Sequence, residues 1–149
     1  MSILRTLRIS ASALTAERLR MDVISNNIAN SQTTRTAEGG PYKRKQVVFQ
    51  AQETGVSPLA RFRRRTDLAE VHDLSGVEVR RIVENDEGMV RTYDPTHPDA
   101  DAEGYVEYPN VDISTEMVDL MAASRAYQAN VTVIQTAKAI AQAALQIGR

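Results

Sequence analysis

The sequence predicts a mainly α protein whose long N- and C-terminal helices flank a small antiparallel β segment. Residues 3–30 and 110–147 contain neither Gly nor Pro, whereas all five prolines and six of the seven glycines lie between residues 39 and 109. Gly and Pro are the strongest breakers of regular structure. Apolar residues also recur every seven positions in both Gly- and Pro-free segments. We therefore divide the chain into an N-terminal core helix (1–30), a β and loop segment (31–109) and a C-terminal core helix (110–149).

The N-terminal segment has the apolar spacing of a helix that packs along other helices. The series comprises Leu7, Leu14, Met21 and Ile28, with Leu4, Ala11 and Ile24 beside it. Near its end stand Asn26, Asn27 and Asn30, although Asn is a poor residue for the middle of a helix and a good capping residue. Two interpretations stay open: the helix ends at Asn30, or these amides bond to adjoining chains in an assembly.

The middle segment contains four candidate strands, at 46–50, 77–83, 89–93 and 104–108. A turn over residues 85–88 separates the second candidate from the third and is typical of a hairpin loop. We therefore expect one small antiparallel sheet.

The C-terminal segment begins clearly, because Pro109 and Asn110 precede it and Asp112 is a plausible N-cap. Two apolar rows run along this helix, which indicates more than one neighbour and favours tube or bundle packing over an isolated two-stranded coil. The first row comprises Ile113, Leu120, Tyr127, Ile134 and Ala141, with Met117, Val131 and Leu145 four positions on. The second comprises Met121, Val133, Ala137, Ile140, Ala144 and Ile147.

Charge is almost balanced over the chain but unevenly placed along it. The formal net charge of −1 argues against nucleic acid as a partner, because phosphate binding usually gives a strongly basic domain. Lys and Arg exceed Asp and Glu by six in residues 31–65, whereas acidic residues exceed basic ones by nine in residues 66–110. Either the two halves of the middle segment neutralise each other, or they pair with neighbouring subunits.

No set of residues predicts catalysis, a cofactor or a metal. The absence of Cys removes thiolate chemistry, and neither His72 nor His97 has a nucleophilic Ser in a glycine elbow nearby. The stretch from Asp99 to Gly104 is similar to the start of a calcium loop but has Asn110 where a bidentate Glu is needed, so we expect an acidic turn. The Arg61–Arg65 cluster is interpreted as a solvated loop.

The sequence predicts neither a transmembrane helix nor a cleavable signal peptide. The most apolar window, 126–147, has Lys138 as its one charge but includes seven Asn, Gln and Thr residues. Arginines interrupt every apolar stretch near the N-terminus. We expect no direct insertion into a membrane.

Three stretches resemble bacterial flagellar rod and hook proteins, and most closely the proximal rod members of that family. The string SALTAERLRMDVISNNIANSQTT (12–34) contains the family's Ser-Ala-Leu start, followed by Arg20, the Asn27–Asn30 motif and Thr33. The strings YKRKQVVFQ (42–50) and GYVEYPNVDISTEMVDLMAASRAYQANVTVIQTAKAI (104–140) are similar to proximal rod proteins. Residues 53–88 match nothing that we can place.

The resemblance implies a structural subunit of the proximal rod, the hollow drive shaft that crosses the periplasm in the flagellar basal body. It implies assembly with copies of itself, with other proximal and distal rod proteins, and with the rod-base adaptor and basal ring. It also implies export by the flagellar type III apparatus without a cleavable signal. The alternatives are another short rod protein or a non-flagellar helical-hairpin adaptor.

An assembly interface is expected along the apolar rows of both helices. Ordering residues 3–30 costs on the order of 40 kcal/mol, whereas full burial of their ten large apolar side chains returns roughly 15–30 kcal/mol, so one partner helix is not enough. The expected interface residues are Leu7, Leu14, Met21, Ile24, Asn27, Ile28, Asn30, Ile113, Met117, Leu120, Tyr127, Val131, Ile134, Ala141 and Leu145.

Overall fold

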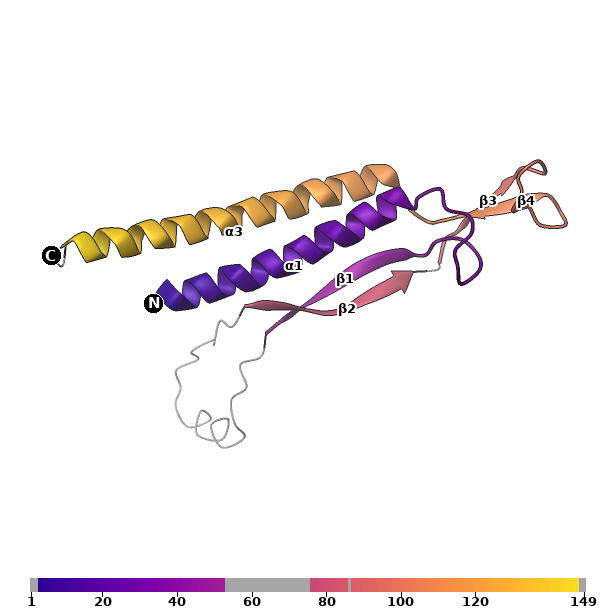
Figure 1. Ribbon diagram of the computed structural model, residues 1–149. Coiled ribbons are helices and arrows are strands. Elements are labelled where there is room, and N and C mark those ends of the chain that lie inside the picture. The colour runs from indigo at the N-terminus through magenta and orange to yellow at the C-terminus, as the bar shows by residue number, and fades with distance from the viewer. Residues whose placement is uncertain (1–2, 53–75, 86, 148–149) are drawn as a thin grey trace, which may run out of the picture.

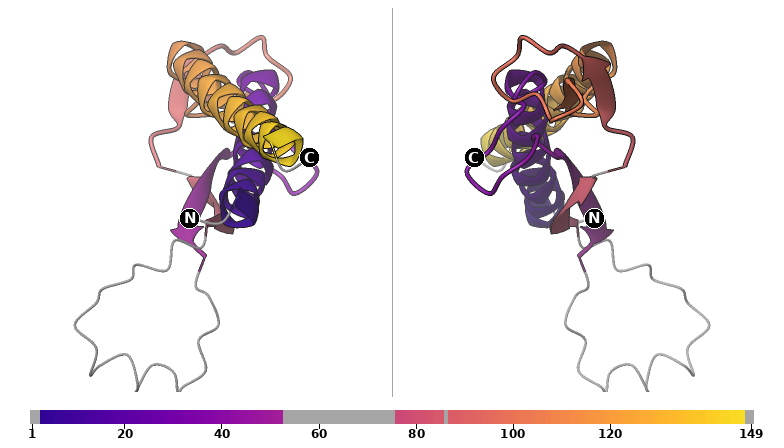
Figure 2. Two further views of the ribbon diagram at one scale, coloured as in Figure 1. Left: turned by 90° about the vertical axis from the view of Figure 1, so that its left-hand side faces the viewer. Right: turned by 90° about the vertical axis from the view of Figure 1, so that its right-hand side faces the viewer.

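The computed structural model describes residues 3–52, 76–85 and 87–147 and shows an elongated molecule built on two long helices (Figure 1). The elements are α1 (Ile3–Ala29), β1 (Arg44–Ala51), β2 (Val77–Asn85), β3 (Val90–Tyr93), β4 (Tyr105–Tyr108) and α3 (Ile113–Ile147). Helix α1 lies between α3 and the β1–β2 ribbon, and β3–β4 projects beyond the helices (Figures 1 and 2). The mainly α fold with a small β middle segment is confirmed.

Both helices begin or end where the sequence indicates. Helix α1 stops at Ala29, and the Asn30 side-chain amide donates to the Asn26 carbonyl oxygen at 2.9 Å, so helix termination at Asn30 is confirmed. Asp112 caps α3 as predicted: its carboxylate accepts from the Ser114 backbone N–H at 3.0 Å and from the Thr115 hydroxyl at 2.7 Å. These hydrogen bonds, with the Thr115 hydroxyl contributing most, lower the pKa of Asp112.

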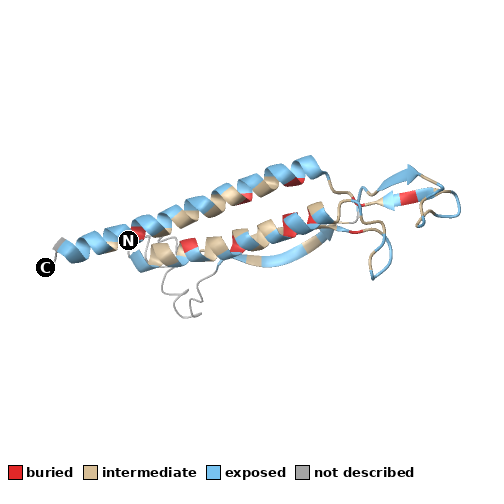
Figure 3. Ribbon diagram, turned by 45° about the horizontal axis from the view of Figure 1, so that its top comes forward, coloured by how far each residue is buried: buried red, intermediate tan, exposed pale blue. Residues whose placement is uncertain are grey.

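The buried residues of the two helices are mainly small or polar. The buried residues of α1 are Ser10, Ala16, Val23, Ile24 and Asn27, and among the described side chains of α3 they are Glu116, Ala123 and Ala137 (Figure 3). Of the ten large apolar side chains in residues 3–30, only Val23 and Ile24 are buried. One chain leaves much of the apolar surface of its helices uncovered.

The strands form two separate two-stranded antiparallel sheets, β1–β2 and β3–β4. The expected single sheet and the hairpin over residues 85–88 are therefore wrong. Strand β2 is paired along its length with β1, while β3 pairs with β4. The intervening turn is held in another way: Asn85 Oδ1 accepts from the Glu87 N–H at 3.0 Å, and the Asn110 amide bonds to the Glu87 carbonyl oxygen. This contact fixes the turn against the segment that leads into α3.

The β1–β2 ribbon is attached to α1 at the start of β2. The Ser12 hydroxyl donates to the Ile9 carbonyl oxygen at 2.7 Å and accepts from the Val77 N–H at 3.1 Å. Gly76 makes this approach possible, because its φ is +100° and an added Cβ would lie 2.4 Å from Ser12 Oγ. Lys45 and Glu84, which face each other across the ribbon, form an ion pair at 3.3 Å that joins the basic and acidic halves of the middle segment.

Candidate assembly site

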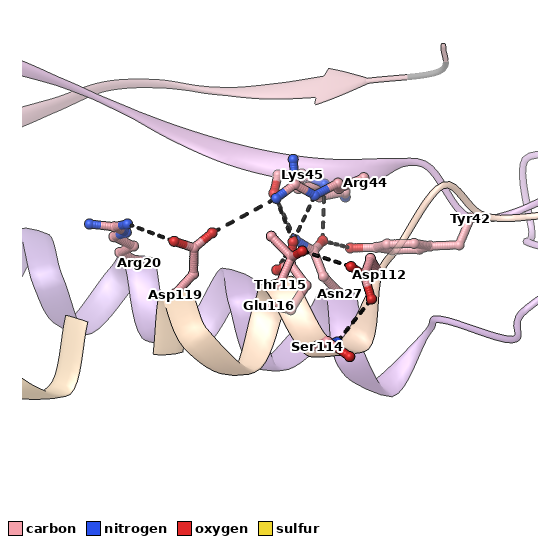
Figure 4. Close-up of polar contacts among 10 residues, drawn as sticks. All are labelled: Arg20, Asn27, Tyr42, Arg44, Lys45, Asp112, Ser114, Thr115, Glu116 and Asp119. Carbon is pink, nitrogen blue, oxygen red and sulfur yellow. Dashed lines mark hydrogen bonds and ion pairs between the residues drawn. The ribbon is translucent and has the colours of Figure 1, made fainter. Parts of the chain in front are cut away.

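A buried polar cluster joins the end of α1, the start of β1 and the first turn of α3. We call Asn27, Tyr42, Arg44, Lys45 and Glu116 the polar cluster (Figure 4). Asn27 and Glu116 are each only 1% exposed. Because a buried polar group without partners is costly, the geometry of these contacts determines how the three elements can pack.

Asn27 has a hydrogen bond for each of its donors and acceptor sites. Its Nδ2 donates to the Lys45 carbonyl oxygen at 2.8 Å and to Glu116 Oε2 at 3.0 Å. Its Oδ1 accepts from the Lys45 N–H at 3.0 Å and lies 2.9 Å from the Tyr42 hydroxyl that donates to it. The Asn27 amide thus bonds β1 to α1, and all of its hydrogen-bonding capacity is used within one chain.

Arg44 neutralises the carboxylate of Glu116. The Arg44 Nε and Nη2 lie 2.7 and 2.6 Å from Glu116 Oε1. Asp119, one turn along α3, lies 3.5 Å from a guanidinium nitrogen of Arg20 on α1. The charged groups therefore tie α3 to both β1 and α1 at one end of the helix pair.

Burial and the negative charges of Glu84 and Glu116 raise the pKa of Tyr42, in that order of importance, so its hydroxyl stays protonated as a donor.

Sequence reasoning did not connect Tyr42, Arg44 or Glu116 with Asn27. These residues are polar and stand next to the apolar rows, which was the one available signal. The hydrogen bond between Asn27 and Glu116 joins residues 89 apart, and such a pair cannot be inferred from one sequence.

The expected interface residues occupy three kinds of position in the single chain. Ile24 and Asn27 are buried. Ile113, Met117 and Leu145 are exposed, with Leu145 at 74%. The half-buried positions are Leu7, Leu14, Met21, Ile28, Asn30, Leu120, Tyr127, Val131, Ile134 and Ala141. Large apolar residues of the second row of α3 are also exposed, namely Met121, Val133 and Ile140, and so is Val118, which the sequence analysis did not single out.

The residues considered for catalysis or metal binding have local structural partners. The Asp101 carboxylate accepts from the backbone N–H groups of Glu103 and Tyr105 at 2.9 Å, which confirms the acidic turn. His97 Nδ1 accepts from the Asp99 N–H at 3.1 Å. Within residues 3–52, 76–85 and 87–147, no group of three His, Cys, Asp or Glu residues could hold a metal ion, and no helix is long and apolar enough to cross a membrane. His72 and Arg61–Arg65 lie outside the described residues.

Both helical regions of the chain match families of known proteins. A family model described as "Flagella basal body rod protein" matches residues 7–35, and one described as "Flagellar basal body rod FlgEFG protein C-terminal" matches residues 102–147. The flagellar basal-body rod protein FlgC of Bacillus subtilis is 44% identical over the full length of both chains. The chain belongs to the FlgC family. The FlgC proteins of Borreliella burgdorferi and Salmonella typhimurium are 42% and 38% identical, over 98% or more of each chain.

The FlgC relatives also cover residues 53–88, which the sequence analysis could not place. The two family models divide the polar cluster, because Asn27 falls in the first matched range and Glu116 in the second. In this FlgC-family chain the polar cluster is therefore one of the places where the two matched regions meet.

Proposed function

We propose that the chain is a structural subunit of the proximal rod of the flagellar basal body. Copies polymerise through α1 and α3, and the helices line a hollow shaft that transmits torque and lets exported subunits pass. The full-length likeness to FlgC rod proteins supports a place in the rod.

The observation that carries polymerisation through the helices is the apolar surface that a single chain leaves uncovered. Met117, Val118 and Met121 on α3 are 53–61% exposed, and Leu4 on α1 is 77% exposed. Large clustered apolar groups at the surface of a soluble protein mark interaction sites. Burial returns about 25 cal/mol for each Å² removed from water, so neighbouring helices that cover these side chains stabilise the assembly.

The proposed partners are copies of the chain, other proximal and distal rod proteins, the rod-base adaptor and the basal ring. The proposed location is the rod where it crosses the periplasm. Export by the flagellar type III apparatus, without a cleaved signal, would deliver the chain there. Membership of the rod family supports these proposals.

A substitution on the exposed face of α3 tests the proposal without disturbing the single chain. Met121→Asp places a charge on a side chain that is 53% exposed. Gln128→Asp, at an exposed polar position of the same helix, is the matched control. In bacteria that carry each variant as their sole copy, we expect Met121→Asp to be missing from purified basal bodies and to abolish swimming. Gln128→Asp should be incorporated.

Circular dichroism of both purified variants should match that of the original chain. Normal incorporation of Met121→Asp would refute assembly through this face. Absence of the unmodified chain from basal bodies would refute the proposed function itself.

A further inference from the structure

Two methionines lie side by side on the exposed surface of α3. Met117 and Met121 are 54% and 53% exposed. Because they are four residues apart on one helix, they lie on the same face, one turn from each other. We call Met117 and Met121 the methionine pair. The pair lies near the start of α3, a helix that is exposed over much of its length (Figure 3).

The methionine pair is more accessible than the other methionines that the structure describes. Met21 on α1 and Met89, which directly precedes β3, are both half-buried. The sequence contains no Cys, so no thiol of this chain competes for a mild oxidant. An oxidant must reach a sulfur atom before it can react, and the sulfurs of the methionine pair are therefore the ones that we expect to react first.

The methionine pair does not hold the single chain together. The buried residues among the described side chains of α3 are Glu116, Ala123 and Ala137, and these face the rest of the chain. A chemical change at Met117 and Met121 therefore alters the outer surface of α3 and leaves its contact with α1 in place.

We propose that Met117 and Met121 form a reversible oxidation site for peroxides, and that their oxidation state determines whether a neighbour can cover this face of α3. Each thioether sulfur takes one oxygen atom from hydrogen peroxide. An S–O bond forms, the O–O bond breaks, sulfur loses two electrons and the second peroxide oxygen leaves as water. Methionine sulfoxide reductases reverse the step with two electrons from a thiol, and the oxygen is released as water.

Oxidation changes this face of α3 from apolar to polar. A sulfoxide oxygen is a hydrogen-bond acceptor, and burial of an acceptor without a donor costs free energy. The apolar side chain of Val118, which is 61% exposed beside the pair, supplies no donor. We expect the oxidised chain to join a neighbour about tenfold or more weakly than the reduced chain. This consequence rests on the proposed function, in which neighbouring helices cover α3, whereas the oxidation itself does not.

Peptide mass spectrometry of the purified full chain tests the oxidation. After a brief treatment with hydrogen peroxide that is stopped with catalase, we expect Met117 and Met121 to gain one oxygen atom each before Met21 and Met89 do. Methionine sulfoxide reductases A and B, supplied with a thiol reductant, should remove both oxygen atoms. Circular dichroism of the oxidised chain should match that of the reduced chain.

Two double variants test the consequence for assembly. Met117→Gln with Met121→Gln imitates the sulfoxides, because each Gln side chain is unbranched and ends in a polar group that accepts hydrogen bonds. Met117→Leu with Met121→Leu is the matched control, because it keeps an apolar surface of similar volume and has no sulfur to oxidise. Bacteria carry each variant as their sole copy, and the amount of the chain in purified basal bodies is measured with and without sublethal hydrogen peroxide during growth.

Without peroxide, we expect the Gln variant to be about tenfold or more depleted from basal bodies and the Leu variant to be incorporated like the original chain. Peroxide should lower incorporation of the original chain and leave that of the Leu variant unchanged, because only the original chain carries the two sulfur atoms.

Three results would overturn the proposal: a methionine pair that oxidises no faster than Met21 and Met89, a Gln variant that is incorporated as well as the Leu variant, or peroxide that lowers the Leu variant as much as the original chain. Absence of the original chain from the basal bodies of unstressed cells would instead refute the proposed function. The mass spectrometry would still decide whether the methionine pair is an oxidation site.

Discussion

Replacing Asn27 with Ala tests whether the polar cluster holds the three elements together. The substitution removes four hydrogen bonds of 2.8–3.0 Å from a side chain that is 1% exposed. At about 1 kcal/mol for each bond, less about 0.5 kcal/mol from the better helix propensity of Ala, the expected loss in the free energy of unfolding is about 3.5 kcal/mol.

Asn26→Ala is the matched control, because it makes the same chemical change one residue earlier on an exposed side chain. The single Tyr42 hydroxyl proton is shared between Asn26 Oδ1 and Asn27 Oδ1, each 2.9 Å away, and water can replace the exposed Asn26 amide, so we expect a loss below about 1 kcal/mol. Urea unfolding followed by circular dichroism measures both variants at a concentration where the chain is monomeric. Hydrogen exchange at the Lys45 amide, which donates to Asn27, reports the local effect.

Two results would contradict this account of the cluster. Equal losses for the two variants would show that burial of Asn27 contributes nothing beyond a surface amide. Unchanged exchange at Lys45 in Asn27→Ala would show that β1 is held to α1 by other contacts.

Three further predictions concern single contacts. Gly76→Ala should lower stability by about 2 kcal/mol in urea unfolding, because the new methyl would meet Ser12 Oγ and the backbone has a positive φ; an unchanged midpoint would contradict this. Arg44→Met should cost about 3 kcal/mol or more by leaving the buried Glu116 carboxylate without its cation, and adding Glu116→Gln should recover part of that loss. Because the pKa of Asp112 is lowered in the folded protein, the ionised carboxylate stabilises the fold above its ordinary pKa of about 3.9, and this stabilisation disappears as the pH falls through the folded value. Asp112→Asn keeps a capping side chain that does not titrate, so the variant should lose less stability on acidification than the original chain. Thermal unfolding at several pH values measures the difference.

Local signals in the sequence predict the helices well. The positions of Gly and Pro give both helices to within a few residues, and Asp112 caps α3 through hydrogen bonds that span only two and three residues. Such features depend on neighbours in the chain, so one sequence is enough to find them.

Features that depend on distant pairing were less accessible. The turn at residues 85–88 has hairpin composition, yet β2 pairs with β1 and β3 pairs with β4. The apolar rows identified Leu120, Tyr127 and Ile134, which are half-buried, but did not show that Glu116 and Ala123 lie deeper in the contact with α1. In the sequence, a buried Glu near a helix start cannot be told from an exposed one. The structure shows that Glu116 is the buried kind, because it is bonded by Asn27 and Arg44, which lie far away in the chain.

The polar cluster also determines when the fold can form. Asn27 and Glu116 are 89 residues apart, so the bond between them closes a large loop, and contacts of this kind slow folding. Until Glu116 has been synthesised, the amide of Asn27 lacks one of its buried partners. The packing of α1 against α3 at the polar cluster is therefore completed only after the chain has been made beyond residue 116.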